Sequence, residues 1–256
     1  MIIYQQSTQW LEADWPAPAK VTAVVSTRSG TMSAPPYEGF NTAQHVGADA
    51  GEVSRCRKLF MQRFQILRQP QWLNQVHGTD VVAAQSDGCE RQADGVFTRQ
   101  TGMVCTIHTA DCLPVFFCDS AGSQVALAHA GWRGLLAGIL ERTLDTFSAP
   151  ADQILCWLGP AISQAYFEVG PEVKDNFQQA QPVPANAFIP SGRRSEAGRH
   201  YYCDLFGLAT ARLKNCGISQ VYGGRYCTYS DPRFFSYRRD KITGRLLSAI
   251  WIRPSV

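Results

Sequence analysis

Two apolar runs near the middle of the chain decide its fold: Ile107-His-Thr-Ala-Asp-Cys-Leu-Pro-Val-Phe-Phe-Cys118 and Val125-Ala-Leu-Ala-His-Ala-Gly-Trp-Arg-Gly134. The short polar segment Asp119-Ser-Ala-Gly-Ser-Gln124 separates them. Apolar runs on both sides of a turn rich in Asp, Ser and Gly are typical of a β-hairpin. We therefore predict two antiparallel strands joined at this turn.

The predicted hairpin brings reactive side chains together. If the strands pair antiparallel about the turn, the numbers of facing residues add up to about 243, within a residue or two. Phe117 then faces Ala126, and Cys112 lies at the open end, close to His129. A thiol beside an imidazole indicates either a metal site or a nucleophile with its base.

Composition limits the class of protein. The chain has 256 residues, 45% of them hydrophobic, which is enough for a substantial core in one large domain or two small ones. The formal net charge of +3 gives no reason to expect a nucleic-acid partner, although it suits a small anion such as phosphate. Every apolar run is much shorter than a membrane span, so we expect no membrane association.

The cysteines indicate a reducing compartment. There are nine of them, an odd number, and their spacing is not that of a disulfide framework. Residues 1–15 are polar and interrupted by acids, unlike the charged and then apolar start of a secretory signal. We expect reduced thiols in a cytoplasmic protein.

Hydrophobic periodicity elsewhere predicts more strands than helices. Strand patterns occur at residues 21–26, 72–77, 81–84, 93–98, 103–109, 154–158, 218–222 and 246–252, and helical patterns at 49–64, 134–147, from 171, and 202–216. Residues 178–198 are rich in Pro, Ala and Arg, and we expect an exposed excursion there. Neither an internal repeat nor a low-complexity linker divides the chain. We predict a single α+β domain, residues 1–256, with mixed β-sheets.

Three candidate metal ligands stand at the ends of predicted strands: His77, Cys112 and His129. Two imidazoles and one thiolate, with a fourth position left to water, form a catalytic zinc arrangement. Asp111 and Asp80 could orient the imidazoles or a bound water. The hairpin brings Cys112 and His129 together, but it does not bring in His77.

His108 is not expected to join this site. It lies four residues before Cys112 in a predicted strand, so the two are about 13 Å apart along the chain. Both could bind one metal only if the strand bent sharply.

A second interpretation needs no metal. Cys112 could be a nucleophile and His129 its base, with a carboxamide or carboxylate orienting the imidazole, which would make a thiol hydrolase of acyl or amide bonds. Metal content separates this interpretation from the first. A blue-copper oxidase fits poorly, because the chain has five histidines and no axial Met follows the Cys-His pair.

Five motifs resemble one known family. They are Asn74-Gln-Val-His-Gly-Thr-Asp80, Ala93-Asp-Gly-Val-Phe97, Thr109-Ala-Asp-Cys-Leu-Pro114, Ala128-His-Ala-Gly-Trp-Arg-Gly134 and Cys227-Thr-Tyr-Ser-Asp-Pro-Arg-Phe-Phe-Ser-Tyr-Arg-Arg239. In this order, over about residues 21–251, they resemble the purine nucleoside phosphorylase family once called "multicopper polyphenol oxidase (laccase)". Its bacterial members have also been described as peptidoglycan editing factors.

The resemblance implies a single-domain α/β/β/α layered fold and a metal on His77, Cys112 and His129, usually taken as zinc, with copper as the alternative. It implies phosphorolysis of adenosine, inosine, guanosine and methylthioadenosine, together with adenosine deamination. The expected catalytic residues are Cys112, Asp111 and His129. Purine nucleosides and phosphate are the expected partners, and the expected assembly is a monomer or a small homo-oligomer. Phenol oxidation with copper has been claimed for the family, but the histidine count argues against it as the main activity.

Phosphorolysis needs basic side chains that hold phosphate. The candidates are Arg28, Arg133, Arg238 and Arg239, with Ser26 and His45 as hydrogen-bond partners. Phe40, Tyr37 or Phe97 could stack on the base, although a core position is the simpler explanation for each. An alternative keeps the site and changes the reaction to hydrolysis of an amide in a cell-wall precursor.

Departures from the family pattern bear on substrate preference more than on the metal site. The loop at residues 27–33 has one glycine where the family often has two, His108 replaces an apolar residue, and residues 163–166 replace a stretch that often carries Gly-Pro and cysteines.

Overall fold

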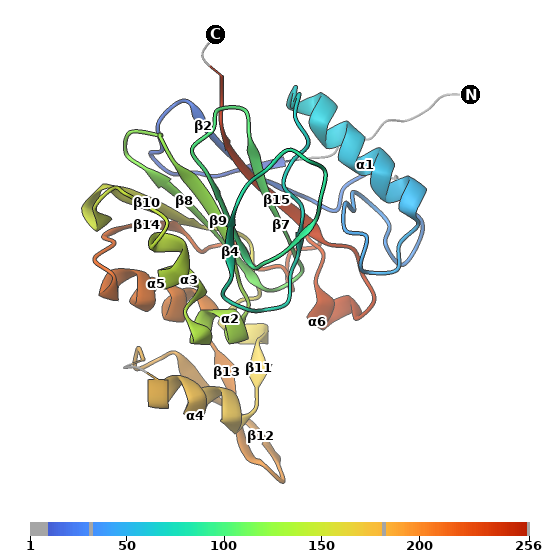
Figure 1. Ribbon diagram of the computed structural model, residues 1–256. Coiled ribbons are helices and arrows are strands. Elements are labelled where there is room, and N and C mark those ends of the chain that lie inside the picture. The colour runs from blue at the N-terminus through green and yellow to red at the C-terminus, as the bar shows by residue number, and fades with distance from the viewer. Residues whose placement is uncertain (1–9, 31–32, 181–182, 255–256) are drawn as a thin grey trace.

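The computed structural model describes residues 10–30, 33–180 and 183–254 (Figure 1). Residues 1–9 of the segment considered as a signal lie outside this description, as do residues 31–32 of the long N-terminal loop and 181–182 of the predicted excursion. Two large sheets are stacked face to face, and helices cover their outer faces. The fold is the α+β class with mixed sheets that the sequence predicts.

The larger sheet has six strands in the order β14-β10-β8-β9-β6-β4. Their bounds are β4 Val81–Ala83, β6 Gly95–Thr98, β8 Leu113–Asp119, β9 Val125–Ala130, β10 Ile154–Leu158 and β14 Gln220–Gly223. The pairs β4/β6 and β10/β14 are parallel and the others antiparallel, so the sheet is mixed. The β8/β9 ladder runs from Leu113 opposite Ala130 to Cys118 opposite Val125. Each pair adds up to 243, which confirms the predicted register.

The second sheet has four antiparallel strands in the order β1-β2-β15-β7. Their bounds are β1 Trp10–Glu12, β2 Val21–Ser26, β7 Val104–Thr109 and β15 Leu246–Ile252. Two smaller sheets complete the described chain: β3 Leu73–Asn74 with β5 Arg91–Gln92, and β11 Glu168–Val169, β13 Gly198–Cys203 and β12 Phe188–Ser195.

The two large sheets are buried on both faces, which explains their uninterrupted apolar sequences. Along β8, Val115 and Phe117 pack toward the helices, whereas Phe116 and Cys118 pack against the other sheet. The four-stranded sheet packs its outer face against α1, Ala50–Arg63, through a cluster that includes Phe60. The order of layers is therefore α/β/β/α, as Figure 1 shows.

Helices α2 Trp132–Ala137, α3 Ile139–Leu144 and α5 Leu205–Asn215 cover the six-stranded sheet (Figure 1). We expected one helix over residues 134–147, but Gly138 has φ of 104° and divides it into α2 and α3. A residue in the left-handed region ends the α-helical hydrogen-bond pattern, and glycine adopts that region without strain. The predicted helix at 202–216 begins only at Leu205, because the residues before Asp204 belong to β13.

The remaining helices lie nearer the rim. They are α4 Pro171–Ala180, α6 Tyr237–Asp240 and the short 3₁₀ turns Ala151–Gln153 and Gln164–Tyr166. Helix α4 and strands β11–β13 project from the body of the molecule (Figure 1). Most of β12 is exposed, so exposure of this part of the predicted excursion is confirmed, and residues 188–195 of it form a strand.

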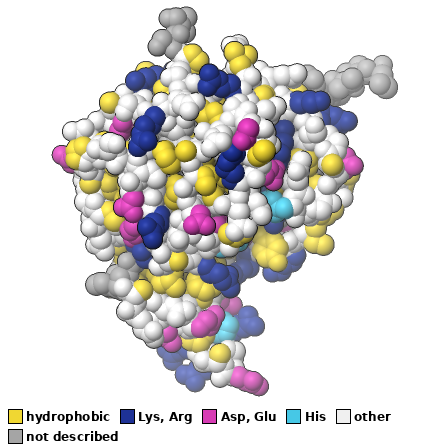
Figure 2. Space-filling view, in the orientation of Figure 1, with side chains coloured by type: hydrophobic (Ala, Val, Ile, Leu, Met, Phe, Trp, Pro, Cys, Tyr) yellow, Lys and Arg dark blue, Asp and Glu magenta, His cyan; other side chains and the backbone are white. Residues whose placement is uncertain are grey.

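Surface charge is mixed in sign. On the face shown in Figure 2, Lys and Arg side chains are interspersed with Asp and Glu. Within the described residues, no helix is both long enough and apolar enough to cross a bilayer.

Candidate metal centre

Three segments of the chain place three metal-ligating groups close together. One ligand atom from each of His77, Cys112 and His129 lies within 4.8 Å of the other two. The Cys112 Sγ atom is 3.8 Å from His77 Nε2, and the ring centroids of His77 and His129 are 4.7 Å apart. Among the His, Cys, Asp and Glu side chains of the described chain, these three form the group that could hold a metal ion.

The hairpin register places two of these groups. His129 faces Pro114 in the β8/β9 ladder, and Cys112 directly precedes the first residue of β8. The third group, His77, comes from a loop. The predicted strand at residues 72–77 was wrong beyond Asn74, and His77 has φ of 60°, a backbone conformation that few residues other than glycine adopt.

A buried carboxylate, Asp94, holds the two histidines in place, and the sequence analysis gave it no role. Its Oδ1 atom is 2.7 Å from His129 Nδ1 and also accepts from the His77 N–H at 3.0 Å. Its Oδ2 atom accepts from the N–H groups of Val76 and Gly78 at 3.1 and 2.7 Å. The backbone carbonyl of Asp94 accepts from the His129 N–H at 2.7 Å. One side chain thus fixes a histidine ring and the loop that carries the other histidine.

The sequence feature that could have indicated a role for Asp94 is an acid at the start of an apolar strand, in the motif Ala93-Asp-Gly-Val-Phe97. A fully buried acid needs several hydrogen-bond donors, because burial otherwise disfavours the carboxylate. Pattern alone does not say which distant donors those are.

Glycine allows the chain to approach the centre closely. A Cβ atom on Gly131 would lie 2.8 Å from His77 Cδ2 and 3.0 Å from Cys112 Sγ. A Cβ atom on Gly134 would lie 3.0 Å from the Gly78 carbonyl oxygen. The Ala-Gly-Trp-Arg-Gly segment therefore lets the His77 loop pack directly on the beginning of α2.

The Cys112–His129 pair favours charge separation. Burial raises the pKa of the Cys112 thiol, but His129 and His77 more than offset this and lower it to about 6. Burial lowers the pKa of His129, whereas the Cys112 sulfur and the Asp94 carboxylate raise it to about 9. At neutral pH the arrangement therefore stabilises a thiolate beside an imidazolium.

The donor set suits a metal cation such as zinc. A thiolate and imidazole nitrogens are ligands that zinc prefers, and three protein ligands leave a coordination position open. His129 directs Nδ1 to Asp94, which leaves Nε2 for a metal, and a carboxylate on the far nitrogen is the usual support for a ligating histidine.

The Asp111 carboxylate lies at the base of the arginine-rich loop, residues 227–239. Its Oδ1 accepts from Thr228 Oγ1 at 2.6 Å, and its Oδ2 accepts from the Arg238 N–H at 2.6 Å. The φ of Asp111 is 94°. This residue therefore ties the arginine-rich loop to the turn that carries Cys112. Asp80, the other carboxylate considered, is exposed.

Several predicted phosphate-binding arginines are engaged within the protein. Arg28 pairs with Glu38 and Asp240, each at 3.4 Å. Arg238 Nη1 donates to the carbonyl oxygens of Tyr166 and Glu168, and Arg239 Nε, Nη1 and Nη2 donate to Asp240 and three backbone carbonyls.

The other predicted phosphate-binding residues differ in their surroundings. Arg133 is exposed near the start of α2, with its guanidinium 4.3 Å from the centre of the Trp132 ring. Ser26 is buried at the end of β2, and its Oγ accepts from the Leu247 N–H. His45 is exposed, and burial of part of its ring and the nearby Arg245 lower its pKa.

The aromatic candidates for base stacking occupy different positions. Phe40 is fully buried beneath α1, and Phe97 packs against the core on the helical side of the six-stranded sheet. Tyr37 donates its hydroxyl to the Val46 carbonyl oxygen at 2.5 Å.

His108 lies outside the metal-ligating group, as expected. Its Nε2 is 2.8 Å from Thr42 Oγ1, and its ring stacks on Trp72 with an interplanar angle of 6°. The backbone of His108 is bonded to a different side chain: Gln75 accepts from the His108 N–H and donates to the His108 carbonyl oxygen. Gln75 thereby attaches the His77 loop to β7.

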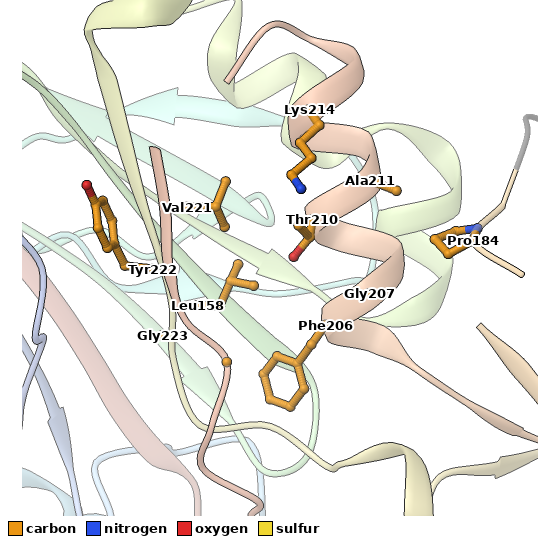
Figure 3. Close-up of a pocket in the computed structure, with 11 residues that line it drawn as sticks. Leu158, Pro184, Phe206, Gly207, Thr210, Ala211, Lys214, Val221, Tyr222 and Gly223 are labelled. Atoms are coloured by element: carbon orange, nitrogen blue, oxygen red, sulfur yellow. The ribbon is translucent and has the colours of Figure 1, made fainter. Parts of the chain in front are cut away.

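Two hollows on the described surface lie apart from the three ligating residues. One, of about 380 Å³, is bounded by α5 and β14; Figure 3 shows Phe206, Thr210 and Lys214 of α5 facing Leu158 and Val221. The other, of about 1010 Å³, is lined by residues of the segments 12–23, 63–68, 101–104 and 251–254. Neither includes His77, Cys112 or His129 in its lining.

Comparison with known proteins shows which family the chain resembles. Residues 22–253 match the family described as multi-copper polyphenol oxidoreductase laccase. A protein of Pseudomonas aeruginosa named purine nucleoside phosphorylase is 47% identical over 245 residues, which cover 95% of this chain and 98% of that relative. Purine nucleoside phosphorylase YfiH of Escherichia coli is 45% identical over 240 residues, 93% of this chain and 96% of that relative.

Solved structures share the fold. A Neisseria meningitidis protein superposes with a TM-score of 0.89 at 41% identity and covers 96% of this chain and 99% of that chain. YlmD from Geobacillus stearothermophilus superposes with a TM-score of 0.84 at 30% identity and covers 98% of this chain and 99% of that chain.

Proposed function

The chain belongs to the multi-copper polyphenol oxidoreductase laccase family, and on that premise we propose that it is a purine nucleoside phosphorylase acting at the His77–Cys112–His129 centre. Three relatives named purine nucleoside phosphorylase are 41–47% identical to the chain over most of its length. The observation that carries the proposal is the convergence of two imidazoles and a low-pKa thiol from three segments. Single-domain organisation over residues 1–256 is part of the proposal.

The proposed metal is zinc, held by His77, Cys112 and His129. Zinc would supply a Lewis acid at the centre when bound. Copper is the alternative, because the same donors accept it. Asp94 supports zinc binding from outside the ligand set by holding His129 and the His77 loop.

In phosphorolysis a phosphate oxygen bonds to the ribose C1′ while the bond from C1′ to the purine breaks and the purine keeps the electron pair. The protein must bind a phosphate anion beside the nucleoside. We propose Ser26, Arg28, His45, Arg133 and Arg238 as candidates for this task. Arg238 is linked to the centre through its backbone N–H, which donates to Asp111, the neighbour of Cys112.

The proposed catalytic residues are Cys112, His129 and Asp111. Cys112 and His129 form the charged pair at the centre, and Asp111 holds the arginine-rich loop against it. We propose methylthioadenosine phosphorolysis and adenosine deamination as further activities of the same centre. The nine free cysteines suit a reducing, cytoplasmic setting, and the proposed assembly is a monomer or a small homo-oligomer.

The decisive experiment is a phosphate-dependent assay combined with elemental analysis of the same sample. With inosine, release of hypoxanthine should require phosphate, and Cys112→Ala should abolish it and lower the bound metal. Cys89→Ala is the matched control, because Cys89 is exposed and lies outside the ligating group, so this variant should keep both the activity and the metal. Full turnover by a metal-free Cys112→Ala protein would falsify the proposal.

A second candidate function is favoured by one contact. His129 Nδ1 bonded to the Asp94 carboxylate, with Cys112 beside the ring, is also the arrangement of a thiol nucleophile with an oriented base. The candidate reaction is hydrolysis of an amide in a muramyl-serine cell-wall precursor. Release of serine by metal-free protein, with no phosphate-dependent cleavage of nucleosides, would favour this candidate over the first.

A further inference from the structure

Arg245 lies at the edge of the metal centre and was not among the phosphate candidates. The β7/β15 ladder ends with Leu246 opposite Thr109, and the two residues after Thr109 lead directly to Cys112. Arg245 immediately precedes Leu246, and its N–H donates to Asn41 Oδ1 at 3.0 Å. Figure 1 shows α6 beside the end of the sheet where β15 begins. Strand pairing thus places Arg245 next to the turn that carries Asp111 and Cys112.

One edge of the Arg245 guanidinium has no partner in the described structure. Its Nη1 donates to the carbonyl oxygens of Thr243 and Gly244 at 2.7 and 3.1 Å. No bond from Nε or Nη2 to another described residue is found, and no described carboxylate forms an ion pair with this side chain. Nε and Nη2 share one edge of the planar guanidinium, and that edge can donate two parallel hydrogen bonds to an oxyanion.

The neighbouring arginines differ in this respect. Arg28 has two carboxylate partners, and Arg239 uses all three of its guanidinium nitrogens within its own loop. Arg245 is instead held by backbone carbonyls alone, which fix its position without neutralising its charge.

The surroundings of Arg245 are partly apolar and aromatic. Its guanidinium carbon is 5.9 Å from the centre of the Tyr237 ring, and the side chain is half-buried. Burial lowers the pKa of Arg245, whereas Cys112, Asp111, Tyr237 and Tyr37 raise it, so these groups face the same region. Asp111 does not form an ion pair with the guanidinium, and both of its oxygens accept hydrogen bonds from Thr228 and Arg238 instead. A half-buried cation that has no ion pair among the described residues favours binding of an anion.

We propose that Arg245 binds the phosphate ion, through its free Nε–Nη2 edge, beside the His77–Cys112–His129 centre. The inference rests on the proposed phosphorylase function for the identity of the anion. It assigns the bidentate phosphate contact to a residue fixed by the β7/β15 ladder, rather than to the arginines whose guanidinium groups are engaged in the arginine-rich loop.

The test is titration calorimetry of the metal-loaded protein with inorganic phosphate alone, without nucleoside. Arg245→Gln should weaken phosphate binding about 10–100-fold, because a charge-assisted pair of hydrogen bonds is lost. Arg245→Lys should weaken it less, since the charge remains but the two-pronged edge is lost. The control is Arg233→Gln, because Arg233 is exposed and paired with Asp231 within the arginine-rich loop. The affinity of this variant for phosphate should match that of the unmodified protein.

A second measurement needs no substitution and covers the case in which Arg245→Gln does not fold. Phenylglyoxal modifies accessible arginines, and saturating phosphate should protect Arg245 but not Arg233, as mass spectrometry of the peptides can show. Equal labelling of Arg245 with and without phosphate, or an unchanged phosphate affinity in Arg245→Gln, overturns the proposal.

Failure of the inference and failure of the proposed function are distinguishable. If phosphate-dependent cleavage of inosine occurs and its KM for phosphate is unchanged in Arg245→Gln, the enzyme stands and the role of Arg245 does not. If phosphate binding depends on Arg245 but no nucleoside is cleaved, the anion site stands and the phosphorylase function does not.

Discussion

Two buried histidines, His108 on β7 and His129 on β9, have opposite electrostatic behaviour. Their exposed fractions are 5% and 3%, so burial is nearly the same. Burial and the nearby Arg57 hold the pKa of His108 well below its ordinary value. In His129 the opposing effect of Cys112 and Asp94 raises the pKa to about 9.

The difference lies in the neighbours rather than in burial. His108 meets a hydroxyl, an indole ring and arginines, none of which carries a negative charge. His129 meets a thiolate and a carboxylate, both of which do. The comparison shows that a histidine on an apolar strand becomes a candidate ligand when tertiary structure gives it an acidic partner.

The largest expected effect comes from removing that acidic partner. Asp94→Asn replaces one acceptor oxygen with a donor, so His129 and the His77 loop lose part of their support. Loss of such a partner lowers metal affinity about 10–100-fold. Competition with a chromophoric chelator measures this change.

The control for Asp94 is Asp87→Asn, an exposed carboxylate paired with Arg91. It should leave metal affinity unchanged. Equal affinities for Asp94→Asn and the unmodified protein would show that Asp94 does not support the centre.

A smaller effect is expected at the other histidine. His108→Gln weakens the contact with Thr42 and removes the ring stacked on Trp72, so the free energy of unfolding should fall by about 1–2 kcal/mol. Metal content should remain that of the unmodified protein, because His108 lies outside the ligating group. Urea denaturation and elemental analysis check the two parts, and a loss of metal would contradict the separation of the two regions.

The smallest effect is a difference in pH dependence. His108 has a lowered pKa in the folded protein, so below about pH 6.5 the unfolded chain binds a proton at this residue that the folded chain does not. Stability should therefore fall as pH decreases, by up to about 1.4 kcal/mol per pH unit for one group.

The groups that act on His108 are those of the surrounding elements: Arg57 of α1, with His45 and Arg245 from flanking loops. His108→Gln should show a shallower decline in stability than the unmodified protein between pH 6 and pH 5, measured by urea denaturation at each pH. Parallel declines would mean that His108 does not titrate as inferred.

Much of the fold follows from local pattern. The β8/β9 register, the strands at 21–26, 154–158 and 246–252 and the helix near 50–63 agree with the sequence predictions. These segments are regular and apolar, so periodicity and turn chemistry specify them. The break at Gly138 and the loop at His77 were missed, because positive φ at one residue leaves little trace in hydrophobic pattern.

The candidate site divides in the same way. Cys112 and His129 follow from antiparallel pairing across one turn, a short-range constraint that the amino-acid sequence carries by itself. The position of His77, the support from Asp94 and the free edge of Arg245 were decided only by tertiary structure. The physical reason is that hydrogen bonds with other segments of the chain position these side chains, and a local hydrophobic pattern does not record such contacts.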